Sequence, residues 1–292
     1  MKNSRINGYE NLQINSYIYD EVKDPKATII IIHGMQEHAG RYDEFAKFLS
    51  DNNYIVIATD LRGHGKTAKD KDSLGLSEGD IYREILADQQ CIINYAKETY
   101  HLPIYVFGHS YGSLVSQTLI QENNDIEKCV LCGTANGGSA LMKAGNAISA
   151  ILGLFTDRNK RGGLLENMCV GGYGKGYENG NWLSRDEQDM INYQKDEYCG
   201  VSFPFSFYRS MINNLVKANK GIDKIGKKKL FLIAGTDDPV GAKGKDVEAL
   251  YNIYKEKGIN AKLKLYKDAR HELLNEINKD EVFKDVLDFF NE

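Results

Sequence analysis

One serine in this sequence stands in a setting that favours nucleophilic chemistry. The segment Gly108-His109-Ser110-Tyr111-Gly112 has the pattern G-x-S-x-G, between an apolar run at 104–107 and a helical segment at 113–121. A sharp strand-to-helix turn needs glycine on both sides of the serine, because neighbouring backbone leaves no room for a Cβ atom. Such a turn presents the hydroxyl beside a helix N-terminus, which favours developing negative charge. The pattern predicts Ser110 as a nucleophile, and the alternative is a serine that only caps the helix.

A serine hydroxyl is a weak nucleophile until a base accepts its proton, and sequence order favours His271 as that base. In folds with this serine turn, an acidic residue and then a histidine follow the serine along the chain. His271 is the one histidine of six that lies beyond position 110. It stands in a loop after the apolar run at 263–266, at the carboxyl end of a predicted strand, where reacting groups collect. A surface histidine without a catalytic part is the alternative.

The acid that orients the imidazole is expected in the loop Gly235-Thr236-Asp237-Asp238-Pro239-Val240, which follows the apolar run at 230–234. Asp238 is favoured, because Pro239 fixes the backbone directly after it. Asp237 stays open as the alternative, or as a turn or capping residue. Asp60 precedes the serine, so we expect it to brace its own loop together with Arg62.

The tetrahedral intermediate of acyl transfer needs two hydrogen-bond donors for its oxyanion. One is the backbone N–H of Tyr111, the residue after the nucleophile. The second is expected in the loop His33-Gly34-Met35-Gln36-Glu37-His38, which follows an early strand. We predict the backbone N–H of Met35 for this part, with His33 and Glu37 shaping the loop. A structural turn without a catalytic part is the alternative.

The rest of the sequence predicts the elements that position these loops. Uninterrupted apolar runs suit strands that are buried on both faces, as in parallel sheets covered by helices. Such runs lie at 27–32, 54–58, 104–107, 129–131, 230–234 and 263–266. Helical periodicity lies between them, at 42–49, 81–96, 247–254 and 283–290. This alternation predicts the α/β class with parallel strands. Residues 12–19 alternate with period two, which predicts a half-exposed strand.

The alternation stops between about residues 134 and 228. The sequence therefore predicts a core in two parts, 1–133 and 229–292, with an inserted helical cap at 134–228. An insertion after the carboxyl end of a strand would overhang a site at that edge. An apolar helical stretch in the cap either binds an acyl chain or packs as cap core; it contains Leu141, Ala144, Ile148, Ile151, Leu152 and Phe155. The residues proposed for an acyl pocket are Ile148, Ile151, Leu152 and Phe155.

Composition limits the classes of partner. A net charge of −4 gives no electrostatic reason to expect nucleic acid or an anionic membrane surface. Five scattered cysteines form a poor disulfide framework, and Cys129 and Cys132 are expected as buried strand residues. The first residues lack the apolar segment of a signal peptide, and no apolar stretch reaches the length of a membrane span. We therefore expect a cytoplasmic protein. No cluster of His, Cys and carboxylates has metal-ligand spacing, so we expect no metal.

Taken in order, these motifs resemble a known family. The loops at 33–38, 60–65, 108–112, 235–240 and 270–272 are similar to those of the monoacylglycerol lipase and lysophospholipase group of α/β-hydrolases, often placed under the serine aminopeptidase S33 heading. The resemblance spans about residues 27 to 280. It implies an eight-stranded sheet with a cap after strand six, and ester hydrolysis through an acyl-enzyme without a cofactor. It also implies the same roles for Ser110, Asp238, His271 and the amides of Met35 and Tyr111.

The substrate stays open at this point, because the cap carries the weakest resemblance. The favoured reading is an esterase for small lipid-like esters, either monoacylglycerols or lysophospholipids. An aminopeptidase would need acidic cap residues to hold a substrate ammonium group, and the candidates are Glu166, Glu178, Asp186, Glu187 and Asp189. The alternative from another class is a ligand-binding protein that keeps the fold without catalysis. The oligomeric state is not predicted.

Overall fold

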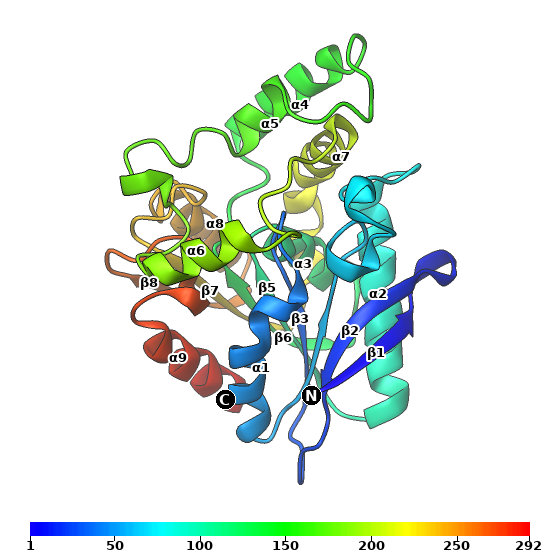
Figure 1. Cartoon of the computed structure of the whole chain (residues 1–292). Helices are drawn as coiled ribbons and strands as arrows, with labels where there is room; N and C mark the ends of the chain where they lie inside the picture. Colours follow the sequence, from blue (N-terminus) through cyan, green and yellow to red (C-terminus); the bar gives the residue numbers. More distant parts are fainter.

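The computed structural model describes all 292 residues of the chain apart from the side chain of Leu141. Its centre is one sheet of eight strands in the order β1-β2-β4-β3-β5-β6-β7-β8 (Figure 1). β2 pairs with β1 and with β4 in antiparallel fashion, and every other neighbouring pair is parallel. This confirms the predicted α/β class and the mostly parallel eight-stranded sheet.

The elements follow the expected alternation along most of the chain. The strands are β1 (Lys2–Asn7), β2 (Gln13–Tyr19), β3 (Thr28–Ile32), β4 (Ile55–Thr59), β5 (Ile104–His109), β6 (Ile126–Cys132), β7 (Lys229–Gly235) and β8 (Asn260–Tyr266). The α-helices are α1 (Asp43–Asp51), α2 (Ile81–Tyr100), α3 (Tyr111–Glu122), α4 (Ala140–Leu152), α5 (Leu164–Cys169), α6 (Glu187–Lys195), α7 (Phe205–Leu215), α8 (Lys245–Glu256) and α9 (Lys279–Asn291). Short 3-10 helices are η1 (Tyr9–Asn11), η2 (Ala39–Tyr42), η3 (Gly65–Thr67), η4 (Lys71–Ser73), η5 (Glu178–Gly180), η6 (Ala218–Lys224) and η7 (Leu273–Asn275).

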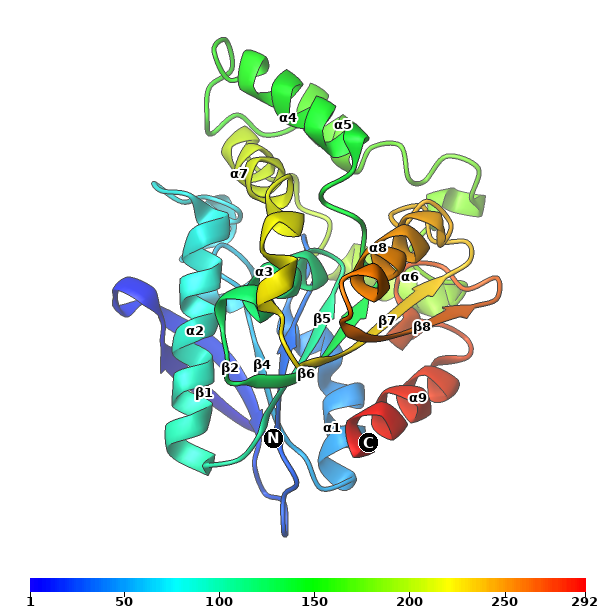
Figure 2. The same ribbon diagram turned by 180° about the vertical axis from the view of Figure 1, so that it is seen from behind.

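Helices cover both faces of the sheet (Figure 1, Figure 2). α1 and α9 pack on one face, and α2, α3 and α8 pack on the other. The side chains of β3 alternate between the two layers: Ile30 and Ile32 join the cluster of α2, α3 and α8, whereas Ile29 and Ile31 join that of α1 and α9. All four are fully buried. Burial on both faces explains why this strand reads as an unbroken apolar run.

The prediction of a half-exposed strand at 12–19 is wrong. In β2 only Gln13 is exposed, and the residues after it are buried. The polar face is covered because its side chains bond to neighbouring segments: the Asn15 amide donates to Asp60 in the loop after β4 (3.0 Å), and the Tyr19 hydroxyl donates to Asp43 at the start of α1 (2.8 Å). Period two therefore identified the strand, while tertiary hydrogen bonds decided its burial. β1, at the sheet edge, has a polar sequence without an apolar period.

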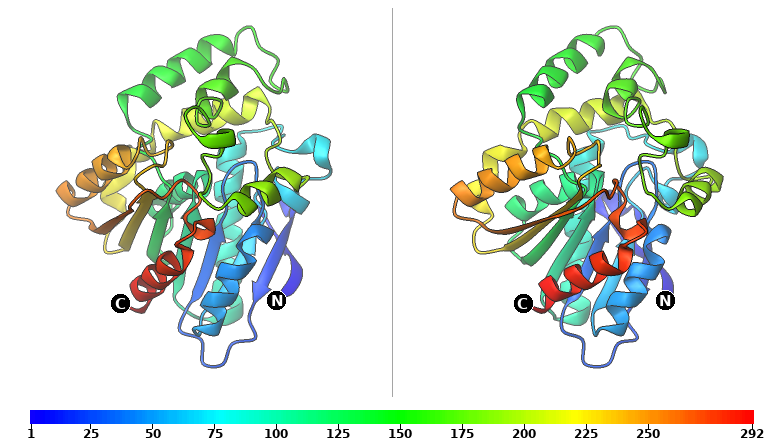
Figure 3. Two further views of the ribbon diagram at one scale, coloured as in Figure 1. Left: turned by 60° about the vertical axis from the view of Figure 1, so that its left-hand side comes forward. Right: turned by 90° about the vertical axis from the view of Figure 1, so that its left-hand side faces the viewer.

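The segment between β6 and β7 lies over the carboxyl ends of the parallel strands (Figure 3). It carries α4, α5, α6 and α7, and no strand is present among its described residues apart from an isolated bridge between Arg161 and Pro204. α7 packs against both α2 and α4, so it lies between α4 and the core. The Leu141 side chain, which the sequence places on the apolar face of the predicted helix, lies outside the described residues. None of the helices in the described part of the chain is long and apolar enough to cross a membrane.

Candidate active site

Ser110 occupies the turn between β5 and α3 in a strained conformation. Its backbone has φ 50° and ψ −119°, a region that non-glycine residues adopt at an energetic cost. A Cβ atom on Gly112 would collide with the carbonyl oxygen of Ile32, which explains the glycine two residues after the serine. The Ser110 N–H donates to the carbonyl of Cys132 (2.9 Å) and ties the turn to the end of β6. The packing of the sheet thus holds the serine at its carboxyl edge.

His271 and Asp238 form a buried pair beside this turn. His271 Nδ1 lies 3.0 Å from Asp238 Oδ2, and the two side chains are 2% and 0% exposed. The other oxygen of Asp238 accepts the N–H of Val240 (2.9 Å), which fixes the carboxylate. Burial lowers the pKa of His271, but the adjacent Asp238 carboxylate outweighs burial and leaves this pKa above its usual value. The arrangement orients the imidazole and stabilises its protonated form.

Of the two adjacent aspartates, Asp238 contacts the imidazole and Asp237 does not. The Asp237 carboxylate pairs instead with Lys243 (2.8 Å) at the surface. Asp60, the third aspartate considered, accepts the N–H groups of Ala39 and Lys66 and so braces the loop after β4. Arg62 does not share in this bracing, because its guanidinium pairs with Asp88.

His109 and Gly133, which both lie beside Ser110, also contact the imidazole of His271. The ring of His109 lies 4.9 Å from that of His271, measured between centroids. Gly133 follows Cys132, whose carbonyl accepts the Ser110 N–H. A Cβ atom added to Gly133 would stand 3.0 Å from His271 Cε1. His271 Nε2 is buried and has no hydrogen-bond partner among the described residues. The second ring nitrogen is therefore left free on the side where β5 and β6 end.

The loop at 33–38 lies directly against the serine. A Cβ atom added to Gly34 would stand 2.5 Å from Glu37 Oε1 and 3.2 Å from Ser110 Cβ, so any larger residue would crowd the serine. Within the described part of the protein, the backbone N–H groups of Met35 and Tyr111 donate no hydrogen bond. Two unpaired amides that flank a serine can serve as donors to an oxyanion. Their role stays a prediction.

Buried charges support this loop from below. The Arg41 guanidinium donates to both oxygens of Glu272 (2.8 and 2.6 Å), to Glu37 (2.9 Å) and to Asp189 of α6 (3.1 Å). Glu37 in turn accepts the N–H of Gly34 (2.6 Å). One cation thus joins the serine-side loop, the residue after His271 and the cap.

One arginine cannot neutralise three carboxylates, so the pKa values of Glu272 and Asp189 shift in opposite directions. Burial raises the pKa of Glu272, but the bidentate contact with Arg41 outweighs it and leaves this pKa well below its usual value. Burial and the nearby Glu272 raise the pKa of Asp189 to about 8. Asp189 Oδ2 is buried and accepts no hydrogen bond from the described residues, so no donor there stabilises a negative charge on this oxygen. Glu272 therefore carries the charge, and Asp189 carries a proton at neutral pH.

The structure brings Trp182 of the cap against His271, a contact that no pattern in the sequence indicates. The two ring centroids are 5.1 Å apart. The contact joins positions 89 residues apart between separate elements, so no local pattern reveals it. Its one signal is that Trp182 is the only tryptophan in the chain.

The acyl-pocket residues take a different position from the one predicted. Ile148, Ile151 and Phe155 are 41%, 61% and 86% exposed, while Leu152 is half-buried and packs towards the core. α7 lies between α4 and the sheet (Figure 1). The exposed side chains therefore form no wall around Ser110, and the prediction finds no support in this arrangement. Periodicity finds an apolar face of a helix but does not say what lies opposite it.

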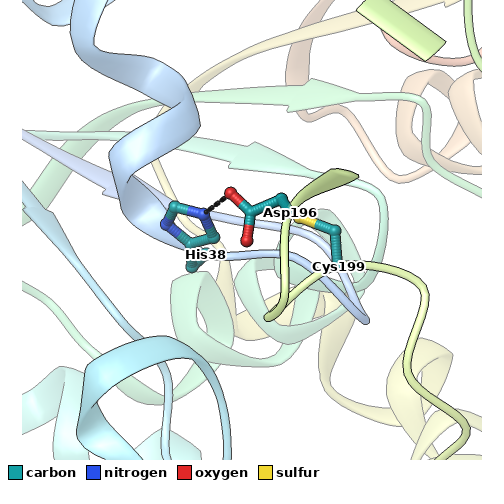
Figure 4. A group of neighbouring side chains, drawn as sticks. All are labelled: His38, Asp196 and Cys199. Atoms are coloured by element: carbon teal, nitrogen blue, oxygen red, sulfur yellow. Dashed lines mark hydrogen bonds and ion pairs between the residues drawn. The ribbon is translucent and has the colours of Figure 1, made fainter. Parts of the chain in front are cut away.

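His38, Asp196 and Cys199 form the one group whose atoms approach metal-binding distances in the described part of the chain (Figure 4). His38 Nε2 lies 2.9 Å from Asp196, and His38 Nδ1 accepts the N–H of Gly40 (3.1 Å). The ring proton therefore stands on Nε2 and is donated to Asp196. A metal at Nε2 would move that proton to Nδ1, where it would face the N–H of Gly40. The group is better explained as a hydrogen-bonded tie between the loop and the cap.

A cavity of about 770 Å³ lies at the opposite end of the sheet and has a simpler explanation than a ligand site. Several lysines line it, but two of their ammonium groups are already used. Lys128 donates to the carbonyl of Phe290 at the end of α9 (2.6 Å), and Lys228 donates to that of Ile225 after η6 (3.1 Å). These lysines satisfy carbonyls at helix ends, as cations commonly do.

Comparisons with known proteins identify the family of the chain and proteins with the same fold. The family model described as serine aminopeptidase, S33 (Hydrolase_4) matches residues 23–278. A monoglyceride lipase homolog of Monkeypox virus is 27% identical over 283 residues, which cover 94% of this chain and 92% of the relative. Phospholipase YtpA of Bacillus subtilis (strain 168) is 26% identical over 271 residues, covering 89% and 93%. A thermostable carboxyl esterase from Bacillus coagulans, solved in complex with glycerol, superposes with a TM-score of 0.90 at 23% identity, covering 99% and 97%.

Proposed function

Since the chain belongs to the serine aminopeptidase S33 family and is an esterase- or lipase-like α/β-hydrolase, we propose that it cleaves lipid-like carboxylic esters through an acyl-enzyme on Ser110. The preferred substrates are monoacylglycerols or lysophospholipids. The observation that carries the proposal is the buried pair of Asp238 and His271, whose free Nε2 stands near the strained serine turn. Residues 134–228 act as a cap over this site and select the substrate.

The first half of the reaction forms the acyl-enzyme. His271 Nε2 accepts the hydroxyl proton as Ser110 Oγ attacks the ester carbonyl carbon. The N–H groups of Met35 and Tyr111 stabilise the negative charge that develops on the carbonyl oxygen. Asp238 stabilises the imidazolium that has formed. The carbon–oxygen bond to the alcohol then breaks, and the departing alkoxide takes the proton from Nε2.

The second half releases the acid. Water enters where the alcohol left, and His271 Nε2 accepts one of its protons as the oxygen attacks the acyl carbon. The tetrahedral intermediate collapses, Ser110 Oγ regains the proton from Nε2, and the carboxylic acid leaves. Every proton passes through Nε2, which fits an imidazole whose one hydrogen bond among the described residues is made at Nδ1.

The state of the acidic cap residues favours ester over peptide substrates. An aminopeptidase needs a carboxylate free to pair with the substrate ammonium. Glu166 already accepts bonds from Ser202, Tyr208 and Gln36, and Asp189 contacts Arg41. The side chain of Asp186 caps α6. Glu178 and Glu187 are exposed, and neither has a bond to the loops around Ser110 among the described residues.

The lipid-like substrate class rests on the relatives. Proteins named monoglyceride lipase and phospholipase align with this chain over nearly its whole length. Monoacylglycerols and lysophospholipids are both esters of glycerol with a single long acyl chain. The shared chemistry is a primary or secondary alcohol ester with one apolar arm.

Labelling and turnover together test the proposal. A fluorophosphonate should label the wild-type chain at Ser110 and leave Ser110→Ala unlabelled. A panel of p-nitrophenyl esters and monoacylglycerols of graded chain length should be hydrolysed, whereas the amide with the same acyl group should not. We expect Ser110→Ala to lower kcat by roughly 10⁴- to 10⁶-fold with an unchanged melting temperature. Labelling without turnover of any ester would favour the ligand-binding alternative, and faster cleavage of the amide would favour the peptidase.

A further inference from the structure

The base loop is enclosed by a piece of the cap that we call the cap strap, residues 177–185. At its start, the Tyr177 hydroxyl donates to the carbonyl of Asp237 (2.7 Å), next to the acid. Further along, the Arg270 guanidinium donates to the carbonyls of Asn181 (2.6 Å) and Ser184 (3.0 Å). These bonds fasten the cap strap to the residue before Asp238 and to the residue before His271.

A third attachment lies on the other side of the base. The N–H of Glu272 donates to the carbonyl of Leu183 (2.7 Å). His271 thus stands between two residues that bond to the cap strap, and Trp182 stands between Asn181 and Leu183, which receive two of those bonds. The backbone ties fix the place of the indole relative to the imidazole.

The indole supplies a constraint that the hydrogen bond to Asp238 lacks. One bond at Nδ1 leaves the imidazole free to tilt about that bond. Trp182 packs on the ring at 5.1 Å between centroids with an interplanar angle of 36°, and Tyr173 packs on the indole at the same distance. His271 is 2% exposed although it lies in a loop. The cap, and not only the core, therefore decides where Nε2 points.

We propose that Trp182 is a positioning residue for His271, which holds the imidazole so that Nε2 faces Ser110. The inference rests on the proposed role of His271 as the base. Trp182 acts through the histidine, and its contribution appears in kcat rather than in substrate binding.

Steady-state kinetics give the first test. Trp182→Ala should lower kcat on a p-nitrophenyl ester by about 10- to 100-fold, with KM changed less than about threefold, because a small misplacement of a catalytic group is costly. Trp182→Phe keeps an aromatic wall and should recover kcat to within about threefold of the wild type. The matched control is Tyr198→Ala, which removes a half-buried cap aromatic that packs on His38 at 6.1 Å, and it should leave kcat unchanged.

Fluorescence gives a second test that does not need turnover. Trp182 is the only tryptophan, so protein emission excited at the indole band reports on this contact. A protonated imidazole near an indole face interacts with it and changes its emission. Wild-type emission should therefore titrate once, at the pH of the acid limb of kcat/KM, and His271→Gln should abolish this titration. The charged or titratable groups around the imidazole are Asp238, Glu272, Glu37 and His109. Burial and the nearby His271 lower the pKa of His109 to about 3.

The outcomes separate this proposal from the proposed function. If the wild type hydrolyses esters and Trp182→Ala matches it in kcat, the positioning role is overturned and the function stands. If emission titrates with His271 but no ester is cleaved, the contact stands and the function is overturned. If Trp182→Ala does not fold, an emission titration that persists in His271→Gln overturns the proposal on its own.

Discussion

The edge of the sheet and the cap above it are held in place by different means. At the sheet edge backbone passes backbone: a Cβ atom on Gly112 would collide with the Ile32 carbonyl, and one on Gly235 with the Ala269 carbonyl. Five cap glycines would meet nothing within 4 Å of an added Cβ atom; they are Gly145, Gly163, Gly172, Gly176 and Gly180. Crowded cap glycines such as Gly137 and Gly153 meet other cap residues, not the loops of the core. The loops that carry Ser110 and Asp238 are therefore fixed by sterics, whereas the cap is fastened to them by side-chain and single backbone bonds. We therefore expect substitutions at the sheet edge to lower kcat directly. Substitutions in the cap should change the orientation of His271 or the stability of the protein.

The largest effect is expected from the acid at the sheet edge. Asp238→Asn keeps the size of the side chain but replaces the carboxylate that holds His271 Nδ1. The imidazole would then lose its orientation and the stabilisation of its protonated form. We expect kcat to fall by roughly 10³- to 10⁴-fold with little change in melting temperature. Ester kinetics and calorimetry on the same preparation measure both quantities.

Asp237→Asn is the matched control for this prediction. It makes the same chemical change one residue earlier, at a carboxylate that pairs with Lys243 at the surface. A surface ion pair contributes about 0 to 1 kcal/mol, so kcat and stability should both stay close to those of the wild type. A larger loss in Asp237→Asn than in Asp238→Asn would show that the pair at Asp238 is not the working one.

Most of the core could be predicted from the sequence, because its signals are local. Strands that are buried on both faces, such as β3 and β7, have unbroken apolar runs. The sterically required glycines on each side of Ser110 make the turn visible as a motif. β1 and the start of β8 were not predictable in this way, since their sequences, KNSRIN and NAK, are polar and their strands are held by pairing with a neighbour.

The contacts of the cap could not be predicted, because they join distant parts of the chain. Trp182 meets His271, and Arg41 meets both Glu272 and Asp189. Nothing near Arg41 in the sequence indicates partners more than 140 positions away. The exposure of α4 could not be predicted for the same reason. The sequence indicates an apolar face on this helix, but that face is exposed because α7 packs between α4 and the core.

An intermediate effect is expected where the edge and the cap share the Arg41 cation. Glu272→Gln on the core side removes an ionised carboxylate with two bonds to the guanidinium. Asp189→Asn on the cap side replaces a group that already carries a proton at pH 7. Urea unfolding at pH 7 should therefore show a loss of about 3 kcal/mol for Glu272→Gln. Asp189→Asn should show no loss and should be more stable than the wild type, because the wild-type chain must bind a proton at Asp189 on folding at this pH and the amide need not.

The pH dependence of the same pair sharpens this comparison. The folded-state pKa of Asp189 is raised to about 8 from an unfolded value of 3.8. A raised carboxyl pKa means that the folded state binds the extra proton, so stability from this group is complete below pH 3.8 and is lost as pH rises through 8. Wild-type melting temperature should therefore fall relative to that of Asp189→Asn between pH 6 and pH 9. A constant difference across this range, or equal losses for the two variants at pH 7, would mean that the cap carboxylate is ionised and supports the core.

The smallest effect is expected on the outer face of the cap. Ile151 is 61% exposed on α4, and α7 lies between this helix and the sheet. A tryptophan at this position would extend into solvent, so Ile151→Trp should leave both the preferred acyl chain length and the melting temperature unchanged. Leu152→Trp is the matched control, since Leu152 is the next residue but is half-buried and packed towards the core. Overpacking there should cost about 1–3 kcal/mol of stability. Turnover on esters of graded length, with melting curves for both variants, measures the contrast. If Ile151→Trp alone shortened the preferred chain, α4 would have to turn this face towards Ser110 during catalysis. The cap would then not be a fixed structure that orients the base, but one that rearranges around each substrate.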